Sequence, residues 1–275
     1  MKIRLGPGGI PLCCKGEPSI NGVKKTAELG LHAMQIAFTH GIYMSLQDAK
    51  KTGEVAKELD VELSVHTPYY INLASETKKI IEESKKRILD SLERGVAMGA
   101  TVVVTHAGYY GKNKIKSTQM VFDACKEIAE HIEKHGWNID FGLETMGKQK
   151  SWGTLDEIID VCKKMKHLIP YLDAAHLYAI RGGQIDYKEI FDKLEILKLK
   201  NLHSHFSGIK YSLVGIGRGN EKQHVPMKMA GPDFENYAKE ILRRNKDITI
   251  ISESPILEVD SLAMKETFEK LGYRF

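Results

Sequence analysis

Short runs of apolar residues alternate along the chain with longer segments in which apolar positions recur every three or four residues. The first pattern is typical of strands, and the second of helices that are apolar on one face. The run Val102–Val104 is apolar at every position, as expected for a parallel strand buried on both faces. Eight strands are predicted in this way: Lys2–Leu5, Ala33–Phe38, Val61–His66, Thr101–His106, Ile139–Glu144, Ile169–Asp173, Asn201–Ser207 and Ile248–Glu253.

The segments between these runs predict helices. In the third segment, the apolar positions that share one face are Ile81, Ile88, Leu92 and Val96. Ser75 is expected to cap this helix, because a serine hydroxyl accepts a hydrogen bond from a free N–H of the first turn. Gly99 is expected to end it, since glycine readily adopts the left-handed conformation that follows many helices.

The alternation of eight strands with about eight helices predicts the fold class. Eight strand–helix units that close on themselves form an α/β protein, a single (β/α)8 TIM barrel, here spanning residues 1–275. A doubly wound open sheet is the alternative, but no GxGxxG motif follows the first strand. With 42% hydrophobic and 28% charged residues, the composition is that of a globular protein.

Charge and cysteine content narrow the function classes. The net charge of +4 does not indicate indiscriminate nucleic-acid binding, although it leaves room for a local basic groove. The four cysteines form no CxxC pair, so a metal site would use nitrogen and oxygen ligands. No apolar run approaches the roughly 18 residues of a membrane helix, and the first residues lack the apolar stretch of a secretory signal. A cytoplasmic protein with no membrane partner is therefore expected.

Six consecutive predicted strands have, at or close to their ends, a residue that can bind a metal ion. In a barrel the carboxyl ends of the strands meet at one face, so these side chains are expected to converge. Five strands end in His66, His106, Glu144, Asp173 and Glu253, the seventh carries His203 and His205 close to its end, and His176 follows three residues after Asp173. Imidazole and carboxylate ligands suit zinc or manganese. Because the set exceeds the needs of one four-coordinate ion, we expect two or three ions with a bridging carboxylate, an arrangement that supports phosphoryl displacement.

Two other histidines have ligand-like spacing. His131 and His135 lie four residues apart, as in some zinc sites. They fall near the C-terminus of a predicted helix and far from any strand end, so a solvated, dipole-compensating role is expected for both.

Six short motifs, in this order and spacing, resemble the endonuclease IV family of metal-dependent abasic-site endonucleases. They are HTPYYINL (66–73), THAG (105–108), GLET (142–145), LDAAH (172–176), HFS (205–207) and SESP (252–255). The resemblance covers nearly the whole chain and implies a TIM barrel with a zinc centre of two or three ions, in which manganese is an alternative. The ligands that it implies are His66, His106, Glu144, Asp173, His176, His205, His224 and Glu253.

The same resemblance implies an activity and roles for particular residues. Glu144 would bridge two ions, and Glu144 and Glu253 are the expected catalytic carboxylates. A metal-bound hydroxide would attack the phosphate 5′ to an abasic site in double-stranded DNA and leave a 3′-hydroxyl. Tyr69 matches the aromatic residue that enters the DNA where the nucleotide is flipped out; the alternative is a tyrosine packed on its loop. A monomer is expected.

Basic residues are predicted in the loops after the sixth and seventh strands, on the active face. Arg218 and Lys210 are the expected DNA contacts among them. Several glycines accompany these residues, so a flexible, solvated lid is the alternative. The full basic set is Arg181, Lys210, Arg218, Lys222 and Lys228.

The sequence departs from the family pattern at three places. The family usually has an aspartate two residues before the histidine matched by His224, but Lys222 stands there and Glu221 precedes it. Either Glu221 replaces that ligand or the third ion is loosely held or absent. The loop 39–43 lacks the Gln/Arg-rich stretch of bacterial members, and the first strand ends in GPGG (6–9) where many members have a histidine.

Two other functions remain open at this point. A single-metal sugar isomerase or epimerase of the same kind of barrel would need only Glu144, Asp173, His203 or His205, and Glu253. Four further histidines would then have no role: His66, His106, His176 and His224. A non-catalytic protein that binds damaged DNA or metal is the third possibility.

Overall fold

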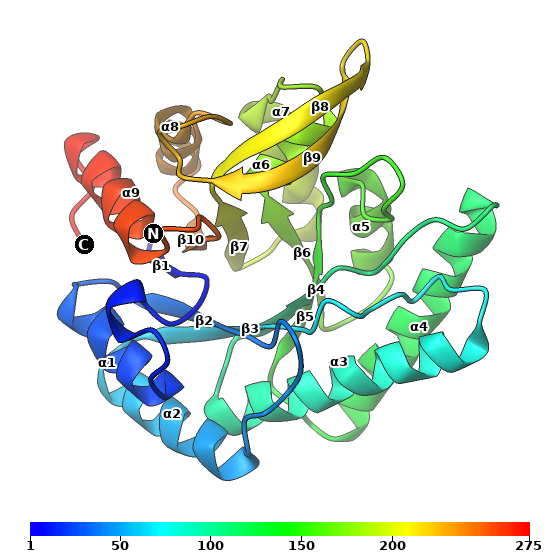
Figure 1. Ribbon diagram of the computed structural model, residues 1–275, viewed down its shortest axis with the longest axis horizontal. Coiled ribbons are helices and arrows are strands. Elements are labelled where there is room, and N and C mark those ends of the chain that lie inside the picture. Colours follow the sequence, from blue (N-terminus) through cyan, green and yellow to red (C-terminus); the bar gives the residue numbers. More distant parts are fainter.

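Eight parallel strands form the centre of the molecule, and the computed structural model describes all residues from 1 to 275 (Figure 1). The sheet order is β1-β10-β7-β6-β5-β4-β3-β2, with every hydrogen-bonded pair parallel. The predicted (β/α)8 barrel is therefore confirmed. The strands are β1 (Ile3–Pro7), β2 (Ala33–Ala37), β3 (Glu62–His66), β4 (Val102–Thr105), β5 (Asp140–Glu144), β6 (Leu168–Asp173), β7 (Asn201–Phe206) and β10 (Asp247–Ser252).

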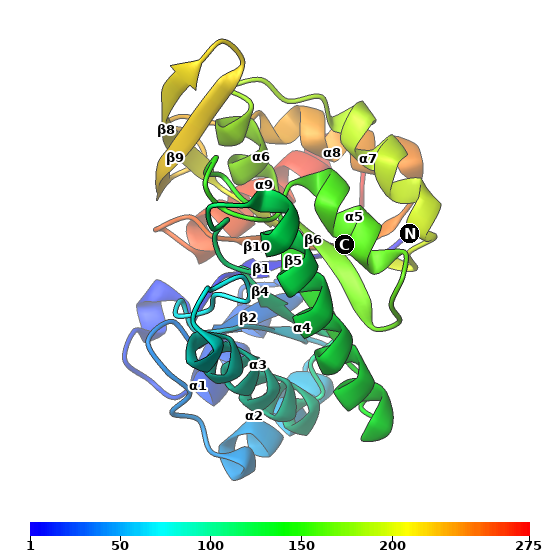
Figure 2. The ribbon, with the colours of Figure 1, turned by 90° about the vertical axis from the view of Figure 1, so that its right-hand side faces the viewer.

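Nine α-helices follow the strands and surround the barrel (Figures 1 and 2). None of them is long and apolar enough to cross a membrane. Two helices follow β6, and short 3-10 helices lie at Leu12–Cys14 and Glu195–Leu197. The α-helices are α1 (Ser19–Glu28), α2 (Leu46–Glu58), α3 (Lys78–Met98), α4 (Lys114–Lys134), α5 (Leu155–Cys162), α6 (Ala174–Ile180), α7 (Tyr187–Leu194), α8 (Phe234–Arg244) and α9 (Glu258–Lys270).

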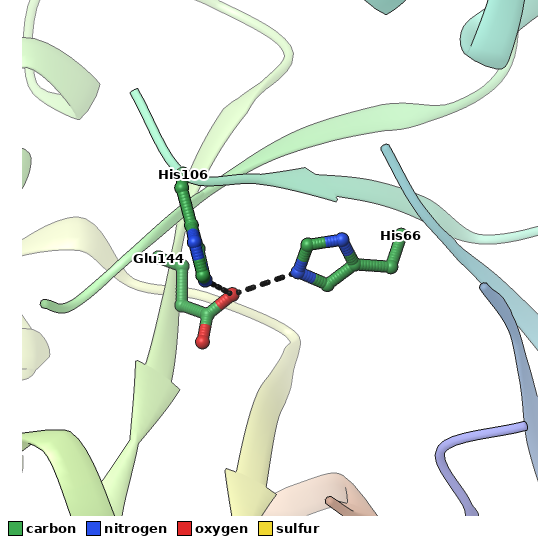
Figure 3. Close-up of side chains that lie close together, drawn as sticks. All are labelled: His66, His106 and Glu144. Atoms are coloured by element: carbon green, nitrogen blue, oxygen red, sulfur yellow. Dashed lines mark hydrogen bonds and ion pairs between the residues drawn. The ribbon is translucent and has the colours of Figure 1, made fainter. Parts of the chain in front are cut away.

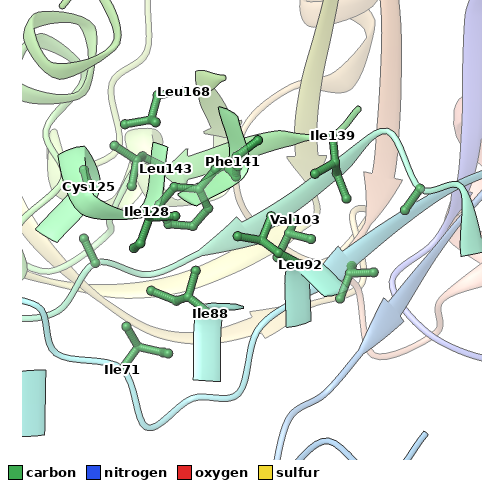
Figure 4. Packing of buried hydrophobic residues seen from close by; sticks show 14 of the residues in the cluster. Ile71, Ile88, Leu92, Val103, Cys125, Ile128, Ile139, Phe141, Leu143 and Leu168 are labelled. Carbon is green, nitrogen blue, oxygen red and sulfur yellow. The ribbon is translucent and has the colours of Figure 1, made fainter. Parts of the chain in front are cut away.

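The main hydrophobic core lies between the strands and the ring of helices. On α3, Ile88 and Leu92 are fully buried and belong to the same apolar cluster as Val103 and Phe141 (Figure 4). Burial of these side chains between helix and sheet removes apolar surface from water and holds each helix against its strand. The helix face predicted from Ile81, Ile88, Leu92 and Val96 is thus the buried face.

The ends of α3 differ in how well the sequence predicts them. Gly99 ends the helix in the left-handed conformation, at φ 67°, as expected. The predicted cap at Ser75 is wrong, because the helix begins after Thr77. The Ser75 hydroxyl instead accepts a hydrogen bond from the Thr77 N–H at 3.2 Å and so forms a local turn before the helix.

The barrel closes between β1 and β2 without a regular strand ladder. The His32 N–H donates to the Leu5 carbonyl at 3.1 Å, which joins the two edges at one point. A Cβ atom at Gly6 would lie 1.6 Å from the carbonyl oxygen of Ala33. The two backbones can therefore approach this closely only because residue 6 is a glycine.

An antiparallel hairpin occupies the long connection between β7 and α8. It consists of β8 (Gly208–Gly215) and β9 (Arg218–Val225), packs against α6, and projects from the barrel (Figures 1 and 2). The prediction that Lys210, Arg218 and Lys222 lie in loops is therefore wrong. All three are on hairpin strands, so the flexible lid that was considered as an alternative is a regular two-stranded element.

Candidate metal centre

All eight predicted metal ligands lie together at the carboxyl ends of the strands. They form three groups in which the candidate ligand atoms lie within 4.8 Å of one another. Glu144 belongs to two groups, and so does Asp173, which joins the three into one cluster. The first group is His66, His106 and Glu144; the second is Glu144, Asp173, His205 and Glu253; the third is Asp173, His176 and His224.

In the first group, two imidazole rings face one carboxylate oxygen (Figure 3). Glu144 Oε2 lies 3.3 Å from His66 Nε2 and 3.1 Å from His106 Nε2. The His66 Nδ1–H donates to the Thr67 carbonyl at 2.8 Å, which leaves the Nε2 lone pair of the neutral ring directed at the group. The first group therefore offers two imidazole nitrogens and a carboxylate oxygen at one point.

In the second group, His205 directs its Nδ1 at the carboxylates, whereas His66 in the first group directs its Nε2. His205 Nδ1 lies 3.1 Å from Glu144 Oε1 and 3.4 Å from Glu253 Oε1. Its Nε2–H donates to Gln35 Oε1 at 3.1 Å, while the amide nitrogen of Gln35 faces the hydroxyls of Ser64 and Tyr171. Gln35 thereby directs Nδ1 of the neutral ring toward the carboxylates.

In the third group, two imidazole nitrogens face each other. His176 Nε2 lies 3.2 Å from His224 Nε2. His176 Nδ1–H donates to the Thr145 carbonyl at 2.9 Å. The Ser207 hydroxyl donates to the Gly208 carbonyl, so Ser207 Oγ accepts a hydrogen bond from His224 Nδ1–H at 2.6 Å. Both Nε2 atoms are acceptors in the neutral rings, an arrangement that is favourable only with a proton or a cation beside them.

Glu221 completes the third group, and Lys222 does not take part. Glu221 Oε2 lies 2.9 Å from His176 Nε2, and its other oxygen pairs with Lys148 Nζ at 3.2 Å. The β8–β9 register skips Lys222, because Lys210 pairs with Gln223 and Tyr211 with Glu221. This bulge lets Glu221 and His224, three residues apart, both face the third group, while Lys222 is exposed. The structure thus brings Glu221, one of the two alternatives left by the sequence, beside His176 of the third group.

Each group contains a buried polar atom that has no hydrogen-bond partner. These atoms are His106 Nε2, Asp173 Oδ2 and Glu221 Oε2; the first and last have short ion-pair contacts, but without hydrogen-bond geometry. An unpartnered buried polar atom is costly, and a bound cation would satisfy all three. With nitrogen and oxygen donors only, the residues fit zinc or manganese.

Charge balance within the cluster shifts several pKa values. Burial opposes ionisation of Glu144, but His106 and His205 outweigh it and hold the pKa of that carboxyl well below its usual range. Burial raises the pKa of Asp173. Burial also opposes the charged form of His205, yet Glu253 and Glu144 raise its pKa to about 9. Glu144 likewise raises the pKa of His106 against the effect of its burial, so without a metal ion the protonated rings of His106 and His205 supply positive charge beside Glu144.

A cleft of about 520 Å³ opens above the cluster. Tyr69 lines it and is 58% exposed, in keeping with a residue that can contact a bound molecule. The other two predicted DNA contacts do not line this cleft. Arg218 donates to Gln149 Oε1 at 3.0 Å, and Lys210 is exposed on β8.

The remaining histidines lie elsewhere. His203 lies two residues before His205 on β7 and lines a different cavity, so of the two candidates on this strand only His205 reaches the cluster. His131 and His135 stack at the end of α4 with ring centroids 4.0 Å apart and belong to no ligand group.

Sequence reasoning missed the residues that orient the ligands. Gln35 and Ser207 each fix one imidazole, and Lys148 pairs with Glu221. A signal existed for Gln35, which is the one polar residue of the buried strand AMQIA (33–37). No pattern marks Lys148, because its contact depends on where the hairpin brings Glu221.

Comparison with known proteins agrees with this fold. Residues 23–271 match the xylose isomerase-like TIM barrel family. The chain belongs to this family. An uncharacterized protein of Methanocaldococcus jannaschii is 30% identical, with 97% of each chain covered. The "Probable endonuclease 4" of Aquifex aeolicus is 30% identical over 68% of this chain and 69% of its own length. A solved D-tagatose 3-epimerase-like protein has a TM-score of 0.74 and 22% identity over 98% of this chain and 96% of its own.

The family and the buried ligand groups lead to one conclusion. The protein is a metal-binding enzyme of the xylose isomerase-like TIM barrel family. Of the proteins that it resembles, one curated relative is named as an endonuclease, and one solved structure with the same fold is named as epimerase-like.

Proposed function

We propose that this family member is a metal-dependent phosphodiesterase that incises double-stranded DNA 5′ to abasic sites. The observation that carries the proposal is the set of three ligand groups joined by Glu144 and Asp173. One ion needs only one group. A cluster of ions suits phosphodiester hydrolysis, in which charge on the attacking and the leaving oxygen must be stabilised together. The likeness to the Aquifex aeolicus "Probable endonuclease 4" supports the same reaction.

The residues present define what the chain contributes. The first and second groups would hold two ions bridged by Glu144, and the third would hold one with Glu221 as an added ligand. When bound, such ions polarise the phosphate and lower the pKa of water to near neutrality. Gln35, Thr67, Thr145 and Ser207 hold the imidazoles in their tautomers, so the ligands need little rearrangement.

Tyr69 and the cleft would act on the substrate. Tyr69 lies at the mouth of the cleft, and its ring centroid is 6.3 Å from that of His66. From there its side chain could fill the space left by a flipped-out nucleotide. Lys210 and Arg218, outside the cleft on the hairpin, would contact phosphates farther from the reacting one.

A sugar epimerase or isomerase is the second candidate. The second group alone provides Glu144, Asp173, His205 and Glu253, which are enough for a single ion beside a carbonyl substrate. The likeness to a D-tagatose 3-epimerase-like protein accompanies this observation. This function would leave the first and third groups without a role.

The deciding experiment uses protein purified without chelator and a duplex with one synthetic abasic site. Incision 5′ to the site, seen on a denaturing gel with zinc or manganese and lost in Glu144→Gln together with bound metal, is the expected result. Glu17→Gln, on the exposed loop before α1, is the matched control. No incision with either metal, combined with interconversion of ketoses in the same preparation, would establish the sugar chemistry instead.

A further inference from the structure

Positive charge is concentrated in two loops beside the cleft. Residues 105–117 and 145–154 follow β4 and β5 and contain no aspartate or glutamate. On the other side, the loop 38–45 after β2 has no charged residue besides a histidine, and the loop 67–77 after β3 has only Glu76. The lysines of these two segments are here called the lysine ridge: Lys112, Lys148 and Lys150 lie in the loops, and Lys114 and Lys116 lie in the first turn of α4.

The two loops are joined into one structural unit. Tyr109 and Ser151 form an antiparallel bridge, and the Tyr110 N–H donates to the Lys150 carbonyl at 2.9 Å. Lys150 Nζ lies 5.3 Å from the centroid of the Tyr109 ring, and Lys114 Nζ lies 4.4 Å from that of Tyr110. The ammonium groups are therefore placed by aromatic rings and backbone contacts rather than by carboxylates.

Most of these lysines are free to bind an anion. Lys112, Lys114, Lys116 and Lys150 are exposed and form no ion pair, whereas Lys148 pairs with Glu221. Tyr109 and Lys148 also line the metal-centre cleft, so the ridge begins at the edge of that cleft. A row of unpaired cations that starts next to a phosphodiesterase centre matches the regular negative charge of a nucleic-acid backbone.

We propose that the lysine ridge binds the sugar–phosphate backbone of duplex DNA on one side of the reacting phosphate. The tyrosine-bearing loops after β2 and β3, which contain no lysine or arginine, then face the lesion. The proposal rests on the function proposed above, and it assigns to the β4 and β5 loops a binding role distinct from that of Tyr69, Lys210 and Arg218.

The test measures equilibrium binding of a short, intact, fluorescently labelled duplex over a series of NaCl concentrations. An intact duplex has no abasic site, so turnover does not interfere. A plot of log K against log [NaCl] falls with increasing salt, and each lost phosphate contact makes this negative slope shallower by about 0.9. The triple variant Lys112→Gln/Lys114→Gln/Lys116→Gln is expected to bind more weakly, with a slope that is shallower by about 2 to 3.

The matched control is Lys50→Gln/Lys51→Gln/Lys57→Gln on α2. These three lysines are exposed, form no ion pair and carry the same charge, but they lie away from the cleft. The control is expected to keep the wild-type slope. The proposal would be overturned if both triple variants kept the slope of the wild type, or if both became shallower by the same amount. Binding to phosphatidylserine vesicles but not to duplex would overturn it in favour of a membrane surface.

The same proteins separate this proposal from the proposed function. Incision by the wild type, with an unchanged slope in the ridge variant, overturns the ridge and leaves the nuclease function. Ridge-dependent duplex binding without incision supports the ridge and overturns the nuclease function.

Discussion

At the scale of single residues, the metal centre depends on which ring nitrogen of each histidine its hydrogen-bond partner leaves free. Thr67 and Thr145 carbonyls, Ser207 and Gln35 each occupy one nitrogen of a histidine. The other nitrogen of each ring is then directed at a carboxylate or at a second imidazole. Such neighbouring contacts typically change metal affinity by about 10- to 100-fold when they are lost.

Glu221 and Lys222 give a direct test of the third group. We expect Glu221→Gln to weaken the binding of one ion by about tenfold or more, because it removes a buried carboxylate charge beside His176. Lys222→Gln should leave metal binding unchanged, since this side chain is in solvent. Equilibrium dialysis with zinc measures both. Equal effects of the two substitutions would show that Glu221 is not a ligand.

His205 predicts a pH dependence of metal binding. Its carboxylate neighbours raise the pKa of the metal-free ring to about 9, so at neutral pH a proton occupies the group and must leave before an ion binds. Zinc affinity should therefore increase about tenfold per pH unit from about pH 7 and level off above about pH 9. Competition with a chelator at each pH measures this. His203→Gln is the control, because burial lowers the pKa of His203 and keeps it neutral over the same range. A flat profile below pH 9 would contradict the assignment.

At the scale of helices and strands, the sequence predicts the barrel well and the hairpin poorly. All eight barrel strands occur within two residues of their predicted bounds, because a strand buried on both faces is mostly apolar. The β8–β9 hairpin has a different basis. Much of it is exposed, and its buried Ile209 packs with Ala175 and Ala179 of α6 in a small cluster apart from the barrel core. The glycines therefore suggested a loop, and the position of Glu221 beside His176 could not be predicted.

The β1–β2 closure predicts a destabilising substitution. Gly6→Ala should lower the free energy of unfolding by about 3 kcal/mol, the upper end of the usual cost of overpacking, because its Cβ would overlap the backbone of Ala33. Gly111→Ala is the control, since its Cβ would meet no backbone atom and would make ordinary contacts with the Ser117 hydroxyl at 3.4 Å and Glu76 Oε1 at 3.8 Å. Urea unfolding measures both. An unchanged midpoint for Gly6→Ala would mean that the two edges can move apart without loss of stability.

At the scale of the whole molecule, the ligand cluster ties distant parts of the chain together. Its members come from the ends of β3, β4, β5, β6, β7 and β10, with His224 and Glu221 added by the hairpin. Several carboxylates are buried together with several imidazoles at the centre of the barrel mouth, where groups of like charge repel one another. Ions bound there satisfy these groups and cross-link six strands at once, so metal binding and global stability are coupled.

Chelation is accordingly expected to lower the thermal stability of the whole barrel. A ligand at about 100 times its dissociation constant stabilises the folded state by about 2.7 kcal/mol. In chains of about this length, each kcal/mol corresponds to roughly 2–4 °C in Tm, so one ion should raise Tm by about 5–10 °C and further ions should add to this. Calorimetry of chelated and zinc-loaded protein measures the shift, with Glu144→Gln as the comparison because Glu144 belongs to two groups. A full shift in that variant would show that stabilising ions bind outside the cluster. A small shift in the wild type, saturating with one ion, would favour the single-metal sugar chemistry over the phosphodiesterase.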